Sequence, residues 1–305
     1  MIKYHIKTPA KINLGLTVNK KQNLNDPFHE ISTIIAPIAI YDEIVITSND
    51  FEDLTFKSSV EISDLNLKPV YLKFCKTFAD LLENSQSSKN IHVALIKNIP
   101  IGAGLGGESS NIAAFFHLLL QYFRISPSTQ RIDTFLCDVG SDTSFFYYQK
   151  FALATQKGNT LTFLSVFDDD FIYYHCGLSY NSIYSKDIYI IMPLGLSLRT
   201  KVMYKSFDSQ LHTDRYSDFL SNYNSFLGVA CTLNPLFKVL SKKLRSLFKY
   251  CGFTGSGSAF YIFDLNNNEE KTRKQLEKLD SYISKKTGIT LQILKTHIIK
   301  DGFYS

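Results

Sequence analysis

Residues 100–111 constrain the fold of this chain more than any other segment. They read Pro-Ile-Gly-Ala-Gly-Leu-Gly-Gly-Glu-Ser-Ser-Asn, with four glycines in six consecutive positions, and a largely apolar run from Ile112 to Leu120 follows. Glycines adopt positive φ and let backbone N–H groups approach a ligand with no Cβ in the way. Ser109, Ser110 and Asn111 suit the cap and first turn of a helix, whose free N–H groups and dipole favour an anion. The segment predicts a phosphate-binding loop attached to a buried helix.

Two common phosphate-binding motifs do not describe this loop. A P-loop ends in Gly-Lys-Ser/Thr, but the chain has no lysine between Lys97 and Lys150. A dinucleotide fingerprint belongs to an early βαβ unit with an acidic residue about 20 residues further on, and that setting is absent. Two interpretations of the loop remain. It is either a phosphate site of another class or a plain glycine-rich turn between a strand and a helix.

Composition limits the partners that this chain is expected to have. Its 305 residues, 45% hydrophobic and 20% charged, suffice for one large domain or two of ordinary size. The net charge of +5 is scattered, which argues against nucleic acid and membranes as partners. Five widely separated cysteines without a CxxC pair favour a reducing compartment, and the N-terminal residues lack the apolar core of a secretion signal. We therefore expect a cytoplasmic protein.

Apolar periodicity predicts an α+β chain in two parts. In the first part it predicts strands at 6–18, 31–40, 43–47, 91–96 and 145–153 and helices at 68–83, 112–120 and 129–136. In the second it predicts strands near 160–166, 171–175, 187–192, 259–263 and 290–294 and helices at 226–249 and 268–286. The polar turn at 156–159 predicts a boundary between a domain of residues 1–157 and a domain of residues 158–305.

Three segments, in this order and spacing, resemble the GHMP kinase superfamily. They are Pro9-Ala10-Lys11-Ile12-Asn13-Leu14, the glycine loop from Pro100 to Asn111, and Gly255-Ser256-Gly257-Ser258-Ala259. Phe28-His29-Glu30 and Gly140-Ser141-Asp142 extend the likeness, which spans nearly the whole chain. The resemblance implies a ribosomal-protein-like N-terminal domain for ATP and catalysis, and a ferredoxin-like C-terminal domain for substrate. It is greatest to the branch that phosphorylates the 2-hydroxyl of 4-diphosphocytidyl-2-C-methyl-D-erythritol in non-mevalonate isoprenoid biosynthesis.

The same resemblance assigns catalytic roles to Lys11 and Asp142. Phosphoryl transfer to a hydroxyl requires positioning, charge neutralisation and an acceptor for the proton. By analogy, Asp142 takes the hydroxyl proton, while Lys11 orients the acceptor and stabilises developing charge. If the resemblance is set aside, the sequence favours a solvated charge on a strand for Lys11 and a turn residue for Asp142.

ATP and Mg²⁺ are the implied cofactors, and the glycine loop is their expected site. Loop amides, Ser109 and Ser110 are expected to hold the β- and γ-phosphates, and the Ser110 hydroxyl is the expected protein contact of the metal. The residues implied in ATP binding are Asn66, Lys97, Pro100, Gly102, Gly104, Leu105, Gly106, Gly107, Ser109 and Ser110.

A small molecule, the cytidine diphosphate-linked methylerythritol, is the implied partner of a monomer or weak homodimer. Aromatic side chains suit a nucleobase because they stack on its face while polar groups recognise its edge. The residues implied in substrate binding are Asn13, Phe28, His29, Tyr204, Gly255 and Gly257.

Several residues depart from the pattern of the family. Glu108 replaces a third glycine and brings a carboxylate beside the expected phosphates, and Ser141 replaces the usual alanine. Two alternatives therefore remain beside the cytidine substrate. One is a kinase for mevalonate, phosphomevalonate or homoserine, and the other is a nucleotide-binding relative with weakened catalysis.

Overall fold

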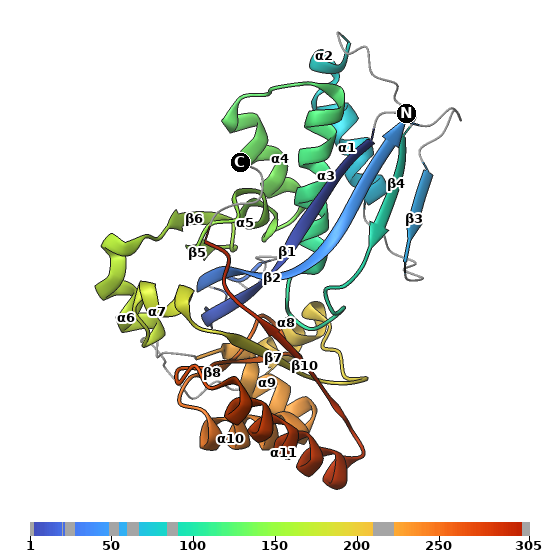
Figure 1. The fold of residues 1–305 in the computed structure, drawn as a ribbon. Helices are drawn as coiled ribbons and strands as arrows, with labels where there is room; N and C mark the ends of the chain where they lie inside the picture. The colour runs from blue at the N-terminus through green and yellow to red at the C-terminus, as the bar shows by residue number, and fades with distance from the viewer. Residues whose placement is uncertain are drawn as a thin grey trace.

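The computed structural model describes residues 3–19, 21, 28–48, 55–59, 67–83, 91–209 and 223–300. They form two β-sheets that pack on one another, with helices on the outer side of each sheet (Figure 1). The chain is therefore α+β, as predicted.

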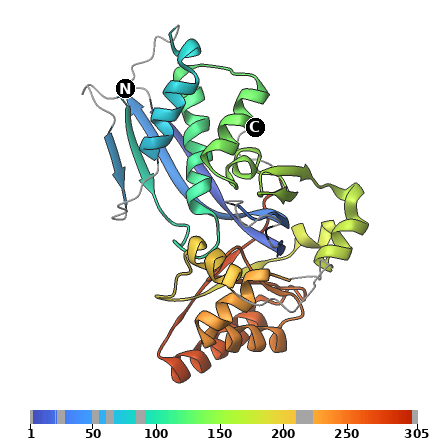
Figure 2. The same cartoon turned by 180° about the vertical axis from the view of Figure 1, so that it is seen from behind.

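The first sheet has the strand order β3-β4-β2-β5-β6, and β1 pairs with β2 in addition. Its strands are β1 (Lys3–Val18), β2 (Ile31–Ser48), β3 (Thr55–Ser58), β4 (Ile91–Ile96), β5 (Ala152–Gln156) and β6 (Thr160–Phe163). Figure 2 shows the helices in front of this sheet: α1 (Leu67–Thr77), α2 (Ala79–Leu82), α3 (Gly107–Phe123), α4 (Thr129–Val139) and α5 (Thr143–Tyr148). Buried aromatic side chains from α1, α3 and α4 join them to the sheet.

The second sheet is antiparallel, with the order β10-β7-β9-β8. Its strands are β7 (Ile188–Pro193), β8 (Cys251–Phe253), β9 (Phe260–Phe263) and β10 (Leu291–Thr296). The helices that pack with it are α8 (Thr200–Ser209), α9 (Ser225–Leu233), α10 (Pro235–Leu247) and α11 (Glu269–Thr287). A 3-10 turn (Val166–Asp168), α6 (Asp169–Cys176) and α7 (Tyr180–Ser185) connect the two sheets.

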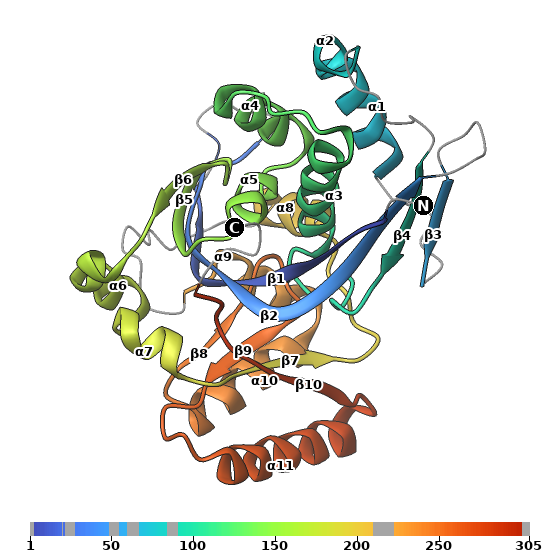
Figure 3. The same ribbon diagram turned by 45° about the horizontal axis from the view of Figure 1, so that its top comes forward.

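The alternation of β7 explains how the sheets come together. Ile188 and Ile190 face β1 and β2, whereas Tyr189 and Ile191 face the helices on the other side. An isolated bridge also joins Ile38 of β2 to Ile298. Figure 3 shows the long strands β1 and β2 passing over the second sheet. A continuous apolar core thus fixes the two halves against each other.

Two predicted strands are helices in the structure. Residues 143–148 form α5, because both Phe145 and Phe146 point into the core from a short helix that begins after Asp142. Residues 169–176 form α6, with two acidic residues in its first turn and a left-handed Gly177 at its end. The aromatic residues in both segments favour strands locally, and tertiary packing overrides this preference.

The predicted domain boundary falls inside a hairpin. Residues 156–159 connect β5 to β6, which pair with each other and belong to the first sheet. The division into residues 1–157 and 158–305 stays a prediction, and the second sheet begins at Ile188. Of the helices in the described ranges, none combines the length and apolarity needed to cross a bilayer.

Candidate active site

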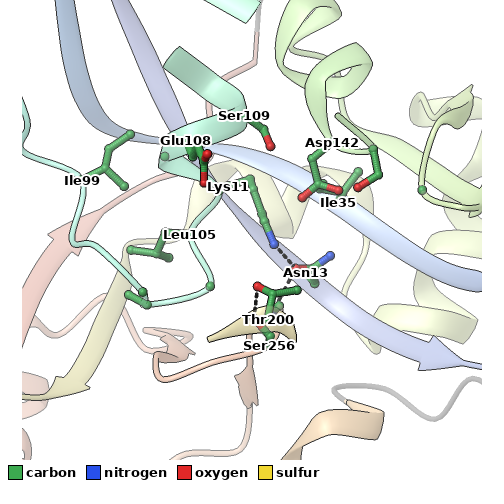
Figure 4. A pocket seen from close by; sticks show the side chains of 18 of the residues that line it. Lys11, Asn13, Ile35, Ile99, Leu105, Glu108, Ser109, Asp142, Thr200 and Ser256 are labelled. Carbon is green, nitrogen blue, oxygen red and sulfur yellow. Dashed lines mark hydrogen bonds between the residues drawn. The ribbon is translucent and has the colours of Figure 1, made fainter. Parts of the chain in front are cut away.

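A cavity of about 400 Å³ brings together most of the predicted site residues. It is lined by β1, the glycine loop, the start of α5, the β5–β6 turn, α8 and the turn at 255–256 (Figure 4). The predicted residues that line it are Lys11, Asn13, Lys97, Pro100, Gly102, Gly104, Leu105, Gly106, Gly107, Ser109, Asp142, Tyr204 and Gly255. Phe28, His29, Ser110 and Gly257 are not among the lining residues, and Asn66 lies outside the described residues.

Helix α3 begins earlier than the serines suggest. Its N-cap is Gly106, which has a φ of 73°, and the Ser110 N–H donates to the Gly106 carbonyl at 3.0 Å. The N–H groups of residues 107–109 therefore precede this helical bond and are the ones available to a ligand. All three residues line the cavity, so the positive end of α3 faces it.

Backbone contacts fix the glycine loop against β1 and the 254–259 segment. The Leu105 carbonyl accepts from the Lys11 N–H at 3.0 Å, and the Ala103 carbonyl accepts from the Ala259 N–H at 3.1 Å. A Cβ at Gly104 would lie 2.4 Å from the Thr254 carbonyl oxygen. Only glycine permits this approach, which explains why two glycine-rich segments far apart in the sequence form one wall.

Lys11 and Asn13 alternate with core residues on β1, so both side chains lie on the cavity side. The Lys11 ammonium donates to Asn13 Oδ1 at 2.5 Å, and the same oxygen accepts from the Gly255 N–H at 2.9 Å. Asn13 Nδ2 donates to Thr33 Oγ1 at 2.9 Å. Lys11 is only 4% exposed, and burial lowers its pKa, while the charge of Asp142 acts in the opposite direction. Asn13 thus holds the ammonium in place without neutralising it.

Asp142 precedes α5 and faces Lys11 across the cavity. Its side chain makes no capping hydrogen bond to α5, and Figure 4 shows it extending toward the same space as Lys11. Burial raises the pKa of Tyr204 to about 12, and the charge of Asp142 adds to this rise. A carboxylate, a buried ammonium and a neutral phenol therefore share the cavity.

The sequence analysis missed Asp42, which holds the segment before the glycine loop. Asp42 is fully buried and pairs with the Lys97 ammonium. Its Oδ1 also accepts from the N–H groups of Asn98 and Ile99, at 2.7 and 2.8 Å. A carboxylate within an apolar strand requires a buried partner, and this was the available signal. Asp42 positions Lys97, whose Nζ lies 3.1 Å from where a Cβ on Gly107 would be.

The geometry of Ser110 does not support its predicted contact with phosphate or metal. Its side chain is fully buried, and its hydroxyl lies 2.5 Å from both the Pro9 carbonyl oxygen and Thr8 Oγ1. Because its N–H is bound within α3, neither group is directed to the cavity. Ser110 instead ties α3 to β1, and Ser109 is the serine that lines the cavity.

Of the three predicted aromatic residues, Tyr204 lines the cavity, and Phe28 and His29 are connected to it through neighbouring side chains. His29 stacks on Tyr204 with ring centroids 5.2 Å apart, and its Nδ1 lies 2.8 Å from the Asn19 carbonyl oxygen. Phe28 is 58% exposed, and the ammonium of Lys157 lies 4.7 Å from its ring centroid. Tyr204 and Lys157 line the cavity, so each links one of these rings to it.

Comparison with known proteins identifies the family. A sequence model described as the GHMP kinases N terminal domain matches residues 71–150. The 4-diphosphocytidyl-2-C-methyl-D-erythritol kinase of Fusobacterium nucleatum is 30% identical, and the alignment covers 89% of this chain and 92% of that protein. The chain belongs to the GHMP kinase family. It is a small-molecule kinase, and its family implies ATP as the phosphate donor.

Other relatives agree with this assignment. A protein of Thermosipho melanesiensis with the same name is 30% identical, over 84% of this kinase and 89% of that protein. A crystal structure of 4-(cytidine 5'-diphospho)-2C-methyl-D-erythritol kinase matches with a TM-score of 0.67 and 21% identity, covering 96% of this kinase and 99% of that chain. The mevalonate kinase of Methanococcus jannaschii matches with a TM-score of 0.62 and 14% identity, covering 98% and 99%. The last two matches concern the fold, which is common to kinases of different acceptors.

The residues of the cavity are compatible with a magnesium ion shared with phosphates. Among the residues that the structure describes, no group of three or more His, Cys, Asp or Glu side chains is placed to hold a metal by itself. Mg²⁺ in kinases is usually held by one or two protein oxygens together with phosphates and water. Glu108 and Ser109, in the first turn of α3, offer oxygen ligands of this type at the cavity.

Proposed function

We propose that this kinase transfers the γ-phosphoryl group of ATP to the 2-hydroxyl of 4-diphosphocytidyl-2-C-methyl-D-erythritol. The observation that supports it is the convergence of Lys11, Asp142 and the first turn of α3 on one cavity with aromatic side chains beside it. Relatives that carry the name of this activity align over most of the chain and so favour the same acceptor.

In this proposal Asp142 and Lys11 divide the work on the acceptor. The Asp142 carboxylate takes the proton of the hydroxyl while the hydroxyl oxygen bonds to the γ-phosphorus. The bond from that phosphorus to the bridging oxygen breaks, and ADP leaves with the electron pair. Lys11 stabilises the negative charge on the transferred group, and its burial strengthens this interaction.

The phosphates of ATP bind the first turn of α3. N–H groups of residues 107–109 and the helix dipole attract phosphate oxygens. Glu108 and Ser109 would hold Mg²⁺, which neutralises phosphate charge when it is bound. Lys97, paired with Asp42, closes the side of this site next to Gly107.

Tyr204, His29 and Phe28 serve the cytosine. Tyr204 offers a ring at the cavity, with Phe226 packed edge-on behind it at a centroid distance of 4.9 Å. His29 is buried against Tyr204, with Nδ1 next to the Asn19 carbonyl oxygen and Nε2 2.9 Å from Asp208 Oδ1, and it holds the Tyr204 ring in place for the base. Mevalonate and homoserine contain no base, so this group of rings has no partner in either.

A panel assay tests the proposal. Purified protein is given ATP and Mg²⁺ with the cytidine substrate, mevalonate, phosphomevalonate or homoserine, and ADP release is measured. We expect turnover with the cytidine substrate at a kcat/KM well above the others. Faster turnover of another acceptor would overturn the assignment of the substrate. If no acceptor is turned over, the chain is better described as a nucleotide-binding relative with weakened catalysis.

Asp142→Asn tests the base. The change should lower kcat by about 10²–10⁴-fold, the usual contribution of a general base, with the Kd of ATP nearly unchanged. Asp138→Asn is the matched control, because Asp138 forms an exposed ion pair with Lys73 and does not line the cavity. Full activity in Asp142→Asn would show that another group accepts the proton.

A further inference from the structure

Lys157 is the lysine of the cavity to which the proposed mechanism gives no role. It is exposed in the turn between β5 and β6, and it lines the cavity. The other two lining lysines already have polar partners, Lys11 with Asn13 and Lys97 with Asp42. Within the described residues, the ammonium of Lys157 forms no ion pair and lies over the ring of Phe28.

The β5–β6 turn connects Phe28 to the catalytic carboxylate. Gly158, which follows Lys157, is buried, and a Cβ there would lie 3.1 Å from the Ile31 side chain and 3.6 Å from Asp142 Oδ1. The protein thus presents Phe28, Lys157 and Asp142 in succession. A nucleoside diphosphate ester presents a base, a diphosphate and an acceptor alcohol in the same order.

We propose that Lys157 and Phe28 form a pair that the substrate separates. The ammonium caps the Phe28 ring in the free protein. On binding, it moves to the diphosphate that joins the cytidine to the erythritol, and the exposed ring face stacks on the base. This inference rests on the proposed function and deepens it, by assigning a specificity residue to the linking diphosphate.

Charge and solvation favour this exchange. A hydrogen bond between two ionised groups is stronger than the contact of an ammonium with a ring at an exposed site. The diphosphate therefore competes successfully for Lys157. A ligand with a base and no phosphate has to displace the ammonium from Phe28 and offers it no ionic contact in return.

This difference predicts opposite effects of one substitution on two ligands. We expect Lys157→Gln to weaken the binding of CDP about tenfold, as for the loss of a hydrogen bond to a charged group. We expect it to leave cytidine binding unchanged or tighten it up to about fivefold, because the capped ring becomes free. In a Phe28→Leu background, Lys157→Gln should no longer tighten cytidine.

Calorimetric titration of the full chain with cytidine, CMP and CDP measures these effects, with the ATP site saturated by a non-hydrolysable analogue. Lys150→Gln is the matched control, because Lys150 lies 5.3 Å from the Phe163 ring centroid, outside the cavity lining. This control should change neither affinity, and the affinity of the ATP analogue reports on folding in every variant.

Two results would overturn the inference while leaving the proposed function intact. One is an unchanged CDP affinity in Lys157→Gln. The other is an equal loss for CDP and cytidine, which would indicate a structural role for the lysine. If the natural chain binds no cytidine nucleotide and the panel assay shows no turnover of the cytidine substrate, the proposed function itself fails.

Discussion

Gly106→Ala tests whether the start of α3 and Lys11 depend on one glycine. Gly106 caps α3 with a φ of 73°. A Cβ there would lie 2.6 Å from the Phe146 ring and 3.1 Å from Lys11 Cγ. Phe146 is fully buried and has no free space into which to move, whereas Lys11 lines the cavity and can be pushed into it.

Two costs combine in this variant. A residue with a side chain in the left-handed region loses about 1–2 kcal/mol, and overpacking of a close-packed site costs about 1–3 kcal/mol. We therefore expect the free energy of unfolding to fall by about 2–5 kcal/mol. A displacement of Lys11 by about 1 Å should also lower kcat by about 100-fold.

Gly288→Ala separates the two costs. Gly288 follows α11 with a φ of 74°, and a Cβ there would meet nothing within 4 Å. Urea unfolding should show only the left-handed penalty of about 1–2 kcal/mol in this variant, with kcat unchanged. If both variants lose the same stability, or if Gly106→Ala keeps full kcat, the argument from close packing is refuted.

Three other substitutions test individual contacts. Lys11→Met should lower kcat at least about 100-fold. It should keep or raise the free energy of unfolding, because burial of the charged ammonium lowers the pKa of Lys11. Urea unfolding should show that the natural chain gains stability as pH rises from that lowered pKa toward 10.5, and that the variant lacks this gain. Asp42→Asn leaves the Lys97 ammonium buried without its carboxylate and should cost about 3–5 kcal/mol by urea unfolding; a loss below about 1 kcal/mol would contradict a buried pair. Ser110→Ala should cost about 1–3 kcal/mol of stability with an unchanged Mg²⁺ dependence of kcat, whereas Ser109→Ala should shift that dependence, and the reverse pattern would reinstate Ser110 as the metal contact.

The sequence predicted which residues share the cavity better than it predicted where the helices around it begin. Lys11, Asn13 and Asp142 were predicted as site residues because they occur in short motifs whose order matches a family, and the structure brings them together at one cavity. The motif could not distinguish Ser109 from Ser110. That distinction depends on Gly106, which starts α3 and thereby turns Ser110 toward β1.

Segments without a motif were predicted less well. Residues 145–148 are aromatic and favour a strand locally, but two of these rings fill the core from α5. Helix α8, which carries Tyr204, was not predicted, although Tyr204 itself was. Asp42 gave a signal only as a carboxylate inside an apolar strand, and its partner Lys97 is 55 positions away in the sequence.

The partners of the lysines determine which charges act on a bound phosphate. Lys97 is paired with a carboxylate, so its net field in the cavity is small. Lys11 is held by the neutral amide of Asn13, which fixes the ammonium and leaves its charge uncompensated. Burial opposes that charge and lowers the pKa of Lys11, while Asp142 supports it from across the cavity. The charged form of Lys11 therefore depends on Asp142, which makes a buried ammonium less costly at the cavity.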